Sequence, residues 1–428
     1  MSDRIVITGI GWVTPLGTEI ETVWRKMLAG ESGITPIEHF DASTFPTTFA
    51  AQVKNYDPTP FLRYPEAHQH IGANTGFALG AARQAWQSAG LDQYDGLDHE
   101  RLGIYMGCGE GSLDFEDYVT ANLAAWDSEA NAVDAVKWTQ VAKERMTAMG
   151  EIEQEPNMPL SHLAMEFEAM GPAYNCLTAC AASTQAIGEA TCILERGDAD
   201  VMITGGAHTM IHPFGVTGFN RLTALSERND DPAHASRPFS QDRDGFVLGE
   251  GGGVLILETY EHARQRGAPI LAEIAGYGST ADAYRITDIH PEGRGAASAM
   301  QQALDAASVA PSDVDYISAH GTGTKENDSI ETKAIKTVFD DQAKSVPVSS
   351  IKSMLGHLIA AAGVIEAIVC TLALRDQKLP PTCNLHQPDH ECDLDYVPNE
   401  AREAEVDVCL SNSFGFGGQN DTLLIRKA

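Results

Sequence analysis

Short apolar runs rich in β-branched residues recur along the chain, and many of them end at glycine. They predict strands at residues 4–9, 102–107, 201–206, 253–258, 270–276, 314–319, 346–350 and 408–413. Alanine-rich segments lie between them and predict helices at residues 72–89, 181–196, 295–307 and 360–375. Apolar strands that alternate with helices indicate an α/β fold whose sheet is buried on both faces.

The order of these elements is similar in the two parts of the chain, which meet near residue 265. We therefore expect two halves, residues 1–265 and 266–428. A length of 428 residues suits one large domain or two packed halves. Because we find no flexible linker or low-complexity tract between the halves, they should pack as one rigid body.

Residues 109–170 interrupt this rhythm. The segment holds thirteen acidic and three basic residues, together with Trp126 and Trp138. Its spacing predicts helices at residues 116–126 and 133–149. We interpret it as an inserted helical cap or an oligomer interface.

The charge balance is strongly acidic, with 60 Asp and Glu against 29 Lys and Arg and a net charge of −31. Such a chain would repel a phosphate backbone, so nucleic-acid binding is not expected. The charge indicates high solubility, with a cationic partner as the alternative. No apolar run of about 18 residues predicts a membrane span, and we see no secretory signal, so we expect a cytoplasmic protein. The eight cysteines are scattered, which favours reduced thiols.

One cysteine stands where a nucleophile could work. Cys180 lies in the sequence TACAAST, residues 178–184, at the predicted start of a helix. The helix dipole there favours a thiolate, and free backbone N–H groups at the same place can hold an oxyanion. The alternative is a buried structural cysteine, because free cysteine is among the most buried residue types.

Two histidines and a lysine follow the ends of predicted strands. His320 opens the sequence HGTGT, which also holds Thr322 and Thr324, and KSMLGH places Lys352 near His357. Ligand sites in open α/β sheets lie outside the carboxyl ends of strands, which favours a shared site.

Two further segments have weaker patterns. The glycine-rich turn NSFGFGGQN, residues 412–420, lacks the Lys-Ser/Thr ending of a phosphate-binding loop and places the bulky Phe416 among glycines. Residues Cys383, His386, His390 and Cys392 suggest zinc, but only one residue separates the last two. That spacing departs from structural zinc sites and favours an ordinary surface loop.

Taken together, TACAAST, HGTGT, KSMLGH and NSFGFGG resemble the β-ketoacyl-acyl carrier protein synthases, the elongating condensing enzymes of fatty-acid synthesis. The likeness extends to ITGIGWVTPLG, SRPFSQDRDGFVLGEGGG, DAYRITDIHPEG and LALRDQKLPPTCNL. It covers nearly the whole chain outside residues 109–170. The resemblance implies the thiolase-like fold, a duplicated α/β/α/β/α five-layer sandwich, and a homodimer.

The resemblance also implies a reaction, the decarboxylative Claisen condensation of an acyl thioester with malonyl-acyl carrier protein. No cofactor or metal is needed. It implies Cys180 as the acyl acceptor and His320 and His357 as the pair that serves decarboxylation. It further implies that Lys352 pairs with Glu366 and that the backbone N–H groups of Cys180 and Phe416 form the oxyanion hole. Phe416 would also gate the acyl pocket, and Phe219 would line it. Thr322 and Thr324 would contact the malonyl unit or the pantetheine arm.

Some features depart from the family. Residues 61–70, near the expected carrier-docking face, are poor in Lys and Arg, which leaves Arg63, Arg221 and Arg228 as the basic candidates.

A ketosynthase of polyketide synthesis is an alternative with the same chemistry. A non-catalytic chain-length subunit would need no Cys180, and a thiolase would not need two histidines with a lysine.

Overall fold

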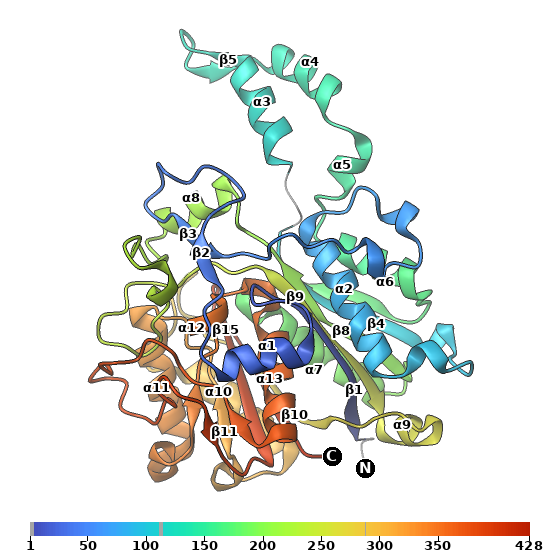
Figure 1. The fold of residues 1–428 in the computed structure, drawn as a ribbon, viewed down its shortest axis with the longest axis vertical. Coiled ribbons are helices and arrows are strands. Elements are labelled where there is room, and N and C mark those ends of the chain that lie inside the picture. Colours follow the sequence, from blue (N-terminus) through green and yellow to red (C-terminus); the bar gives the residue numbers. More distant parts are fainter. Residues whose placement is uncertain (1–3, 111–113, 287) are drawn as a thin grey trace.

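The computed structural model describes residues 4–110, 114–286 and 288–428. A ten-stranded sheet runs through it in the order β12-β11-β15-β16-β10-β1-β9-β8-β4-β7 (Figure 1). The strands are β1 Ile5–Val13, β4 Leu102–Cys108, β7 Ala173–Cys176, β8 Val201–His208, β9 Gly251–Thr259, β10 Ala272–Ala281, β11 Tyr316–Ser318, β12 Val348–Ser349, β15 Val408–Gly415 and β16 Gln419–Arg426.

The two halves of this sheet have the same topology. We number the five strands of each half from first to fifth along the chain. From the outer edge of the sheet inwards, the strand order in both halves is then third, second, fourth, fifth, first. In both, the outer three strands are parallel and the inner two are antiparallel to their neighbours. The first strands of the halves, β1 and β10, pair with each other. The expected duplication is therefore present in the sheet.

Each of the eight predicted strands corresponds to a strand of the ten-stranded sheet, but two strands of that sheet were not predicted. Strand β7 is short and half-exposed, so it lacks the apolar run of a buried strand. Strand β16 begins with the polar residues that follow the glycine-rich turn. Pattern reasoning misses both because their neighbours, not their own hydrophobicity, place them in the sheet.

Helices form three further layers. Helices α7 (Ala182–Glu195) and α13 (Ala362–Asp376) contact each other and the inner faces of the half-sheets. Helix α2 (Ala73–Ser88) covers the outer face of the first half-sheet, and α10 (Arg294–Ala307) covers that of the second, with α11 (Lys325–Phe339) against it. Helix, sheet, helix pair, sheet and helix make the predicted five-layer sandwich.

Small residues let the two central helices approach closely. A Cβ at Gly363 of α13 would lie 1.9 Å from Thr184 Oγ1 of α7. Beside it, the Val364 N–H donates to Ser183 Oγ at 3.0 Å, and Thr184 Oγ1 bonds to Ser413 Oγ at 2.7 Å. This contact fixes the position of the turn that precedes α7.

The inserted segment forms a helical arm that projects from the body (Figure 1). Helices α3 (Phe115–Ala125) and α4 (Ala135–Arg145) are joined by the hairpin strands β5 (Trp126–Asp127) and β6 (Ala132–Val133). The prediction of one helix over residues 133–149 is wrong, because the chain turns extended at Met146 and Thr147 caps the separate helix α5 (Ala148–Ile152). Helix α6 (Met158–Phe167) then packs on α2.

The remaining elements are short. They are α1 Ile20–Leu28, α8 Pro213–Arg221, α9 Tyr260–Arg266, α12 Lys352–Leu355, β2 Ile34–Pro36, β3 Phe49–Ala51, β5 Trp126–Asp127, β6 Ala132–Val133, β13 Lys378–Leu379 and β14 Arg402–Glu403. None of the helices in the described ranges has the length and apolar character needed to cross a membrane.

Candidate functional site

The candidate nucleophile sits in a tight turn between a strand and a helix. Cys180 belongs to the 3-10 turn Ala179–Ala181, which leads directly into α7. Ala179 has φ +49°, in the left-handed region that costs a non-glycine residue energy. The packing of the central helices maintains this conformation, so the turn places the thiol at the carboxyl end of the sheet.

The structure brings the predicted cysteine and both predicted histidines together. Cys180 Sγ lies 3.0 Å from His357 Nε2. The rings of His320 and His357 meet edge to face, with centroids 5.3 Å apart. All three residues are at most 4% exposed. Their donor atoms lie within 4.8 Å of one another, so the same set could hold a thiophilic metal ion.

Burial dominates the electrostatics of this group. It raises the pKa of the Cys180 thiol to about 11, although the charge of Lys352 and the backbone N–H groups of Phe416 and Cys180 act in the opposite direction. The expectation of a thiolate is therefore wrong for the resting protein, because desolvation outweighs the charge of Lys352 and the backbone N–H groups. Burial and the charge of Lys352 hold the pKa values of His320 and His357 well below their usual range, so both imidazoles are neutral, as predicted.

Lys352 pairs with Glu366 behind the histidines. The ammonium of Lys352, on α12, contacts the carboxylate of Glu366, on α13, and both side chains are at most 2% exposed. Burial raises the pKa of Glu366 to about 7, and Lys352 opposes that shift. A buried cation with a buried counter-ion provides a fixed positive field beside the histidines at an acceptable desolvation cost.

A carboxylate that the sequence reasoning missed supports His320. Glu331 of α11 accepts the backbone N–H of His320 at 2.8 Å and that of Gly321 at 2.7 Å. Burial raises its pKa to about 7, while these two N–H donors lower it. The available signal was the polar residues Asn327, Asp328 and Glu331 at helical spacing after HGTGT, all of which are buried in α11.

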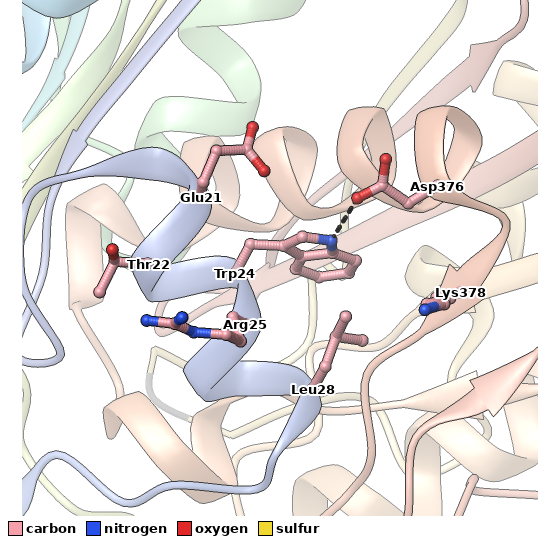
Figure 2. A pocket seen from close by; sticks show the side chains of 7 residues that line it. All are labelled: Glu21, Thr22, Trp24, Arg25, Leu28, Asp376 and Lys378. Carbon is pink, nitrogen blue, oxygen red and sulfur yellow. Dashed lines mark hydrogen bonds between the residues drawn. The ribbon is translucent and has the colours of Figure 1, made fainter.

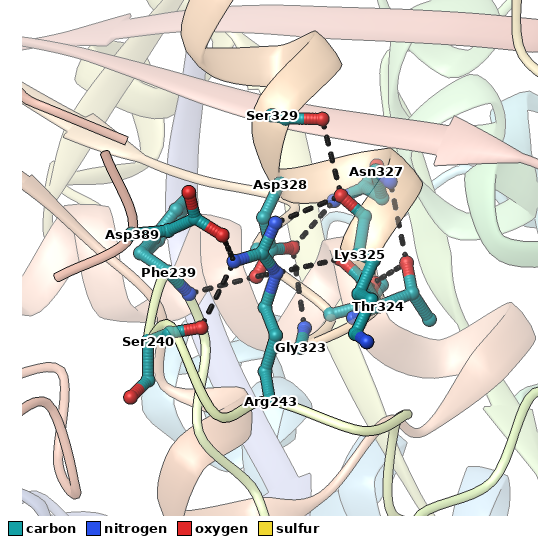
Figure 3. A network of polar contacts seen from close by, with 12 residues as sticks. Phe239, Ser240, Arg243, Gly323, Thr324, Lys325, Asn327, Asp328, Ser329 and Asp389 are labelled. Carbon is teal, nitrogen blue, oxygen red and sulfur yellow. Dashed lines mark hydrogen bonds and ion pairs between the residues drawn. The ribbon is translucent and has the colours of Figure 1, made fainter. Parts of the chain in front are cut away.

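An arginine fixes the loop that follows His320 (Figure 3). Arg243 donates to the carbonyl oxygens of Thr324 at 3.1 Å and Lys325 at 2.8 Å, and to Asp389 at 2.6 Å. Its side chain is 2% exposed and lies 3.5 Å from the fully buried Asp328. Because the loop lines the pocket described below, this network determines the shape of one pocket wall.

We expect Arg243→Leu to lower the free energy of unfolding by about 3–5 kcal/mol, because it leaves the buried carboxylate of Asp328 without its counter-charge. Arg101→Leu is the matched control, since its ion pair with Asp200 is more than one third exposed on both sides. That change should cost at most about 1 kcal/mol. Denaturant unfolding of both variants measures the difference, and equal losses would contradict the expectation.

A pocket of about 600 Å³ opens onto the three buried residues. Cys180, His320 and His357 lie at its base, and Thr322 and Thr324 line its wall, with their hydroxyl oxygens 3.0 Å apart. Phe416 also lines it and is 42% exposed. Phe219 lies outside this lining. It packs edge to face on Phe246 with ring centroids 5.4 Å apart, and Phe246 in turn packs on His357.

The other candidates of the sequence lie elsewhere. Of the possible zinc ligands, Cys392 is fully buried while the side chain of His390 is 85% exposed. None of the metal-like groups found among residues 4–110, 114–286 and 288–428 combines the four.

Another hollow, between α1 and the end of α13, contains Trp24, whose indole N–H donates to Asp376 at 2.8 Å (Figure 2). Its lining contains neither cysteine nor histidine, so it offers no nucleophile.

The basic candidates differ in their contacts. Arg63 pairs with Glu168 at 3.3 Å, and Arg228 pairs with Asp242 at 3.4 Å. Arg221 ends α8 next to Leu222, which lines the pocket mouth.

Sequence comparison identifies a family over most of the chain. The N-terminal domain of β-ketoacyl synthases matches residues 2–263, and the C-terminal domain matches residues 271–386. Among curated proteins, 3-oxoacyl-[acyl-carrier-protein] synthase 2 of Synechocystis is 44% identical, and its counterpart of Coxiella burnetii is 41% identical. In both cases the match covers 99% of this chain and 98% of the relative.

Solved structures agree with this assignment. A β-ketoacyl synthase from Burkholderia phymatum superposes with a TM-score of 0.88 at 31% identity. A type II polyketide ketosynthase, solved with its acyl carrier protein and bound to a hexaketide, gives 0.86 at 33%, and the ishigamide ketosynthase/chain length factor gives 0.86 at 34%. Each match covers the whole of both chains. The thiolase-like five-layer fold, the buried cysteine with two histidines and the full-length matches lead to one conclusion: this chain belongs to the β-ketoacyl synthase family.

Proposed function

We propose that the protein elongates fatty acids by condensing an acyl group, held as a thioester on Cys180, with malonyl-acyl carrier protein to give 3-ketoacyl-acyl carrier protein. The observation that carries the proposal is the contact of 3.0 Å between Cys180 Sγ and His357 Nε2 at the base of an accessible pocket. The curated relatives support the pathway, since those described above are 3-oxoacyl-[acyl-carrier-protein] synthases.

The first half-reaction loads Cys180. The sulfur attacks the carbonyl carbon of the acyl thioester, a new C–S bond forms, and the carrier leaves as its pantetheine thiol. Because burial keeps the resting thiol protonated, its proton must move as the sulfur attacks. His357 Nε2 is the nearest base, and it can pass the proton to the leaving thiolate.

The second half-reaction breaks the bond between the malonyl unit and its carboxylate. Carbon dioxide leaves, and the electron pair of that bond forms an enolate on the thioester. The neutral imidazoles of His320 and His357 can donate N–H bonds to the enolate oxygen as its charge develops, provided that His357 carries its hydrogen on Nε2 once the thiol has been acylated. Lys352 adds a fixed positive field. The enolate carbon then attacks the acyl thioester, so that a C–C bond forms and the C–S bond to Cys180 breaks. The released thiolate takes up a proton from water and returns to the resting thiol.

Backbone donors would stabilise the tetrahedral intermediates. The backbone N–H groups of Cys180 and Phe416 both lower the pKa of the thiol, which supports the proposal that they form the oxyanion hole. Phe416, half exposed above the thiol, would gate the acyl group. Thr322 and Thr324 would contact the malonyl unit or the pantetheine arm. Phe219 would line the acyl pocket only if Phe246 moves aside, because Phe246 separates it from His357.

The test of this proposal is reconstitution. Purified protein, acyl-acyl carrier protein and malonyl-acyl carrier protein should give carbon dioxide and 3-ketoacyl-acyl carrier protein in equal amounts. Release of carbon dioxide without a condensed product would contradict the proposed reaction.

A ketosynthase of polyketide synthesis is the second candidate. One of the matched structures is a type II polyketide ketosynthase, at 33% identity over its whole length. The same residues would act, and the acceptor would be a growing polyketide chain. Repeated condensation from one acyl primer, seen as products several malonyl units longer, would favour this candidate. A non-catalytic chain-length subunit is disfavoured because Cys180 is present and contacts a histidine.

The proposed organisation is a cytoplasmic homodimer, with each chain divided near residues 265 and 266 into a cysteine half and a histidine–lysine half. Strand β7 is an edge strand, with Tyr174 54% exposed and Met170 and Leu177 more than half exposed beside it. An uncovered apolar edge strand is a liability that a second copy would remove.

Light scattering at micromolar concentration should therefore give the mass of two chains. Trp126 or Trp138 should lie at or near the interface, so their fluorescence should change on dilution. A monomer across this range would contradict the dimer. Tyr174→Asp should weaken it, whereas Tyr284→Asp, at a similarly exposed tyrosine outside the sheet edge, should not.

Carrier docking is expected to depend on a local basic patch. Arg221, Arg228 and Arg63 are the proposed contacts, and Arg221 stands closest in sequence to the pocket mouth. If this basic patch binds the carrier, added salt should weaken the binding of an acidic carrier, because salt screens the attraction between opposite charges. The repulsion from distant acidic residues changes little, because charges beyond about 10 Å are already screened at 0.1 M salt. Arg221→Gln should weaken binding more than Arg196→Gln, whose arginine pairs with Asp198. Affinity that rises with salt would contradict the patch.

A further inference from the structure

A row of four buried ionisable side chains lies outside the pocket at Cys180. Glu166 Oε2 contacts His68 Nε2 at 3.1 Å, His68 Nδ1 contacts His162 Nδ1 at 2.7 Å, and His162 Nε2 contacts Glu153 Oε1 at 2.9 Å. Every one of these side chains is at most 9% exposed. The row joins the 3-10 turn Pro65–His68 to α6 and to the end of α5.

The three contacts require three protons. Two neutral imidazoles carry one N–H each, and an ionised carboxylate can only accept. Two protons cannot serve three hydrogen bonds, so one contact would set two lone pairs against each other at hydrogen-bond distance. The row must therefore hold one additional proton.

The distance between the two Nδ1 atoms fits a proton better than a metal ion. Zinc binds histidine nitrogen at about 2.0–2.1 Å, so two nitrogens of a tetrahedral site lie roughly 3.3 Å apart. The observed 2.7 Å is the length of a hydrogen bond. Among the described residues, moreover, no third donor joins these two nitrogens in a metal-like group.

The charged groups around the row support one extra proton. Arg83 of α2 donates to Glu166 Oε1 at 2.7 Å, so one arginine and one added proton oppose the two carboxylates. Arg63 and Glu168 pair with each other at the surface. His39 and Glu250, which bond to each other, face His68 only across a cavity of about 620 Å³ that all three line.

We propose that His68 and His162 share a proton in a pH-dependent clasp that fixes residues 63–68 on helix α6. The Glu166 carboxylate, which contacts His68, also binds this segment directly. It accepts the backbone N–H groups of Arg63 at 2.5 Å and Tyr64 at 3.2 Å. The clasp goes beyond the proposed function and does not depend on it. Two residues of the fixed segment, Pro65 and His68, also line the 620 Å³ cavity.

The clasp should open when the proton count changes in either direction. As pH rises and the additional proton leaves, one of the three contacts loses its hydrogen. As pH falls and a second proton enters, both Nδ1 atoms carry hydrogen and repel each other. Protection of the Arg63 and Tyr64 amides should therefore pass through a maximum between about pH 5 and pH 8, the range in which histidines titrate.

Hydrogen–deuterium exchange of the peptide that contains residues 61–67 tests this directly, after correction for the intrinsic effect of pH. The wild-type protein should show the maximum. His162→Gln cannot carry the additional proton, so its exchange should be about tenfold faster at the wild-type optimum and its protection should show no maximum there. His70→Asn is the matched control, because His70 is an exposed histidine in the same segment and should leave the profile unchanged.

A second measurement covers the case in which His162→Gln fails to fold. In the wild-type protein, ¹⁵N NMR of the imidazoles should show one Nδ1 of the pair protonated and coupled to the other. Flat protection across the pH range in wild-type protein would overturn the proposal. Two unprotonated Nδ1 atoms together with one bound metal ion per chain would also overturn it, in favour of a metal site.

Discussion

A Cys180→Ser protein should lose condensation almost completely, with the rate falling by at least about 10³-fold. Serine keeps the size and the turn, so the loss would report the chemistry of the sulfur. A buried hydroxyl is far harder to ionise than a thiol, and even the Cys180 thiol has its pKa raised to about 11 by burial. His357 would then face a nucleophile that it cannot activate.

The measurement is the steady-state rate of 3-ketoacyl product with saturating carriers. Cys192→Ser is the matched control, because Cys192 is a partly buried free cysteine on the same helix α7 and contacts no histidine. It should retain wild-type activity. A Cys180→Ser protein that elongates at close to the wild-type rate would remove Cys180 from the mechanism.

Replacing either histidine should stop decarboxylation and spare loading. We expect His320→Ala and His357→Ala each to slow carbon dioxide release by about 10²–10³-fold, the usual cost of one donor to a developing oxyanion. Loading of Cys180 should stay measurable in both. It should be slower in His357→Ala, since His357 Nε2 lies 3.0 Å from the sulfur.

Release of ¹⁴C carbon dioxide from labelled malonyl carrier and acylation of Cys180 should be followed separately. His234→Ala is the control, because the side chain of His234 is 62% exposed and pairs with Asp231 on the surface. Normal decarboxylation together with failed acylation in either variant would show that the assigned roles are reversed.

The candidate site was largely predictable because each motif directly follows a strand or begins a helix. Cys180, His320 and His357 are distant in sequence, but the carboxyl ends of their strands meet at one edge of the sheet. The pairing of Lys352 with Glu366 came from the resemblance, and the structure has this contact. The Cys180 pKa was predicted in the wrong direction, because a sequence shows a helix start but not the depth of burial.

What was missed depends on tertiary contacts. Glu331 and Arg243 look like surface residues of an acidic chain, yet both are buried because backbone groups of the loop after His320 need partners. The edge strand β7 and the break at Met146 depend on neighbours and on capping by Thr147, which periodicity does not register. The clasp at His68 joins residues 94 positions apart, and neither histidine lies in a motif.

The central claim is that Cys180 carries the acyl group during condensation, and mass spectrometry tests it most directly. The protein is incubated with acyl-acyl carrier proteins of graded chain length, and the intact mass and the peptide containing Cys180 are measured before and after malonyl-acyl carrier protein is added. We predict one acyl group per chain on Cys180, with a preferred length, and its disappearance as 3-ketoacyl carrier forms. Formation of that product with Cys180 unmodified, or with the acyl group on another residue, would contradict the claim.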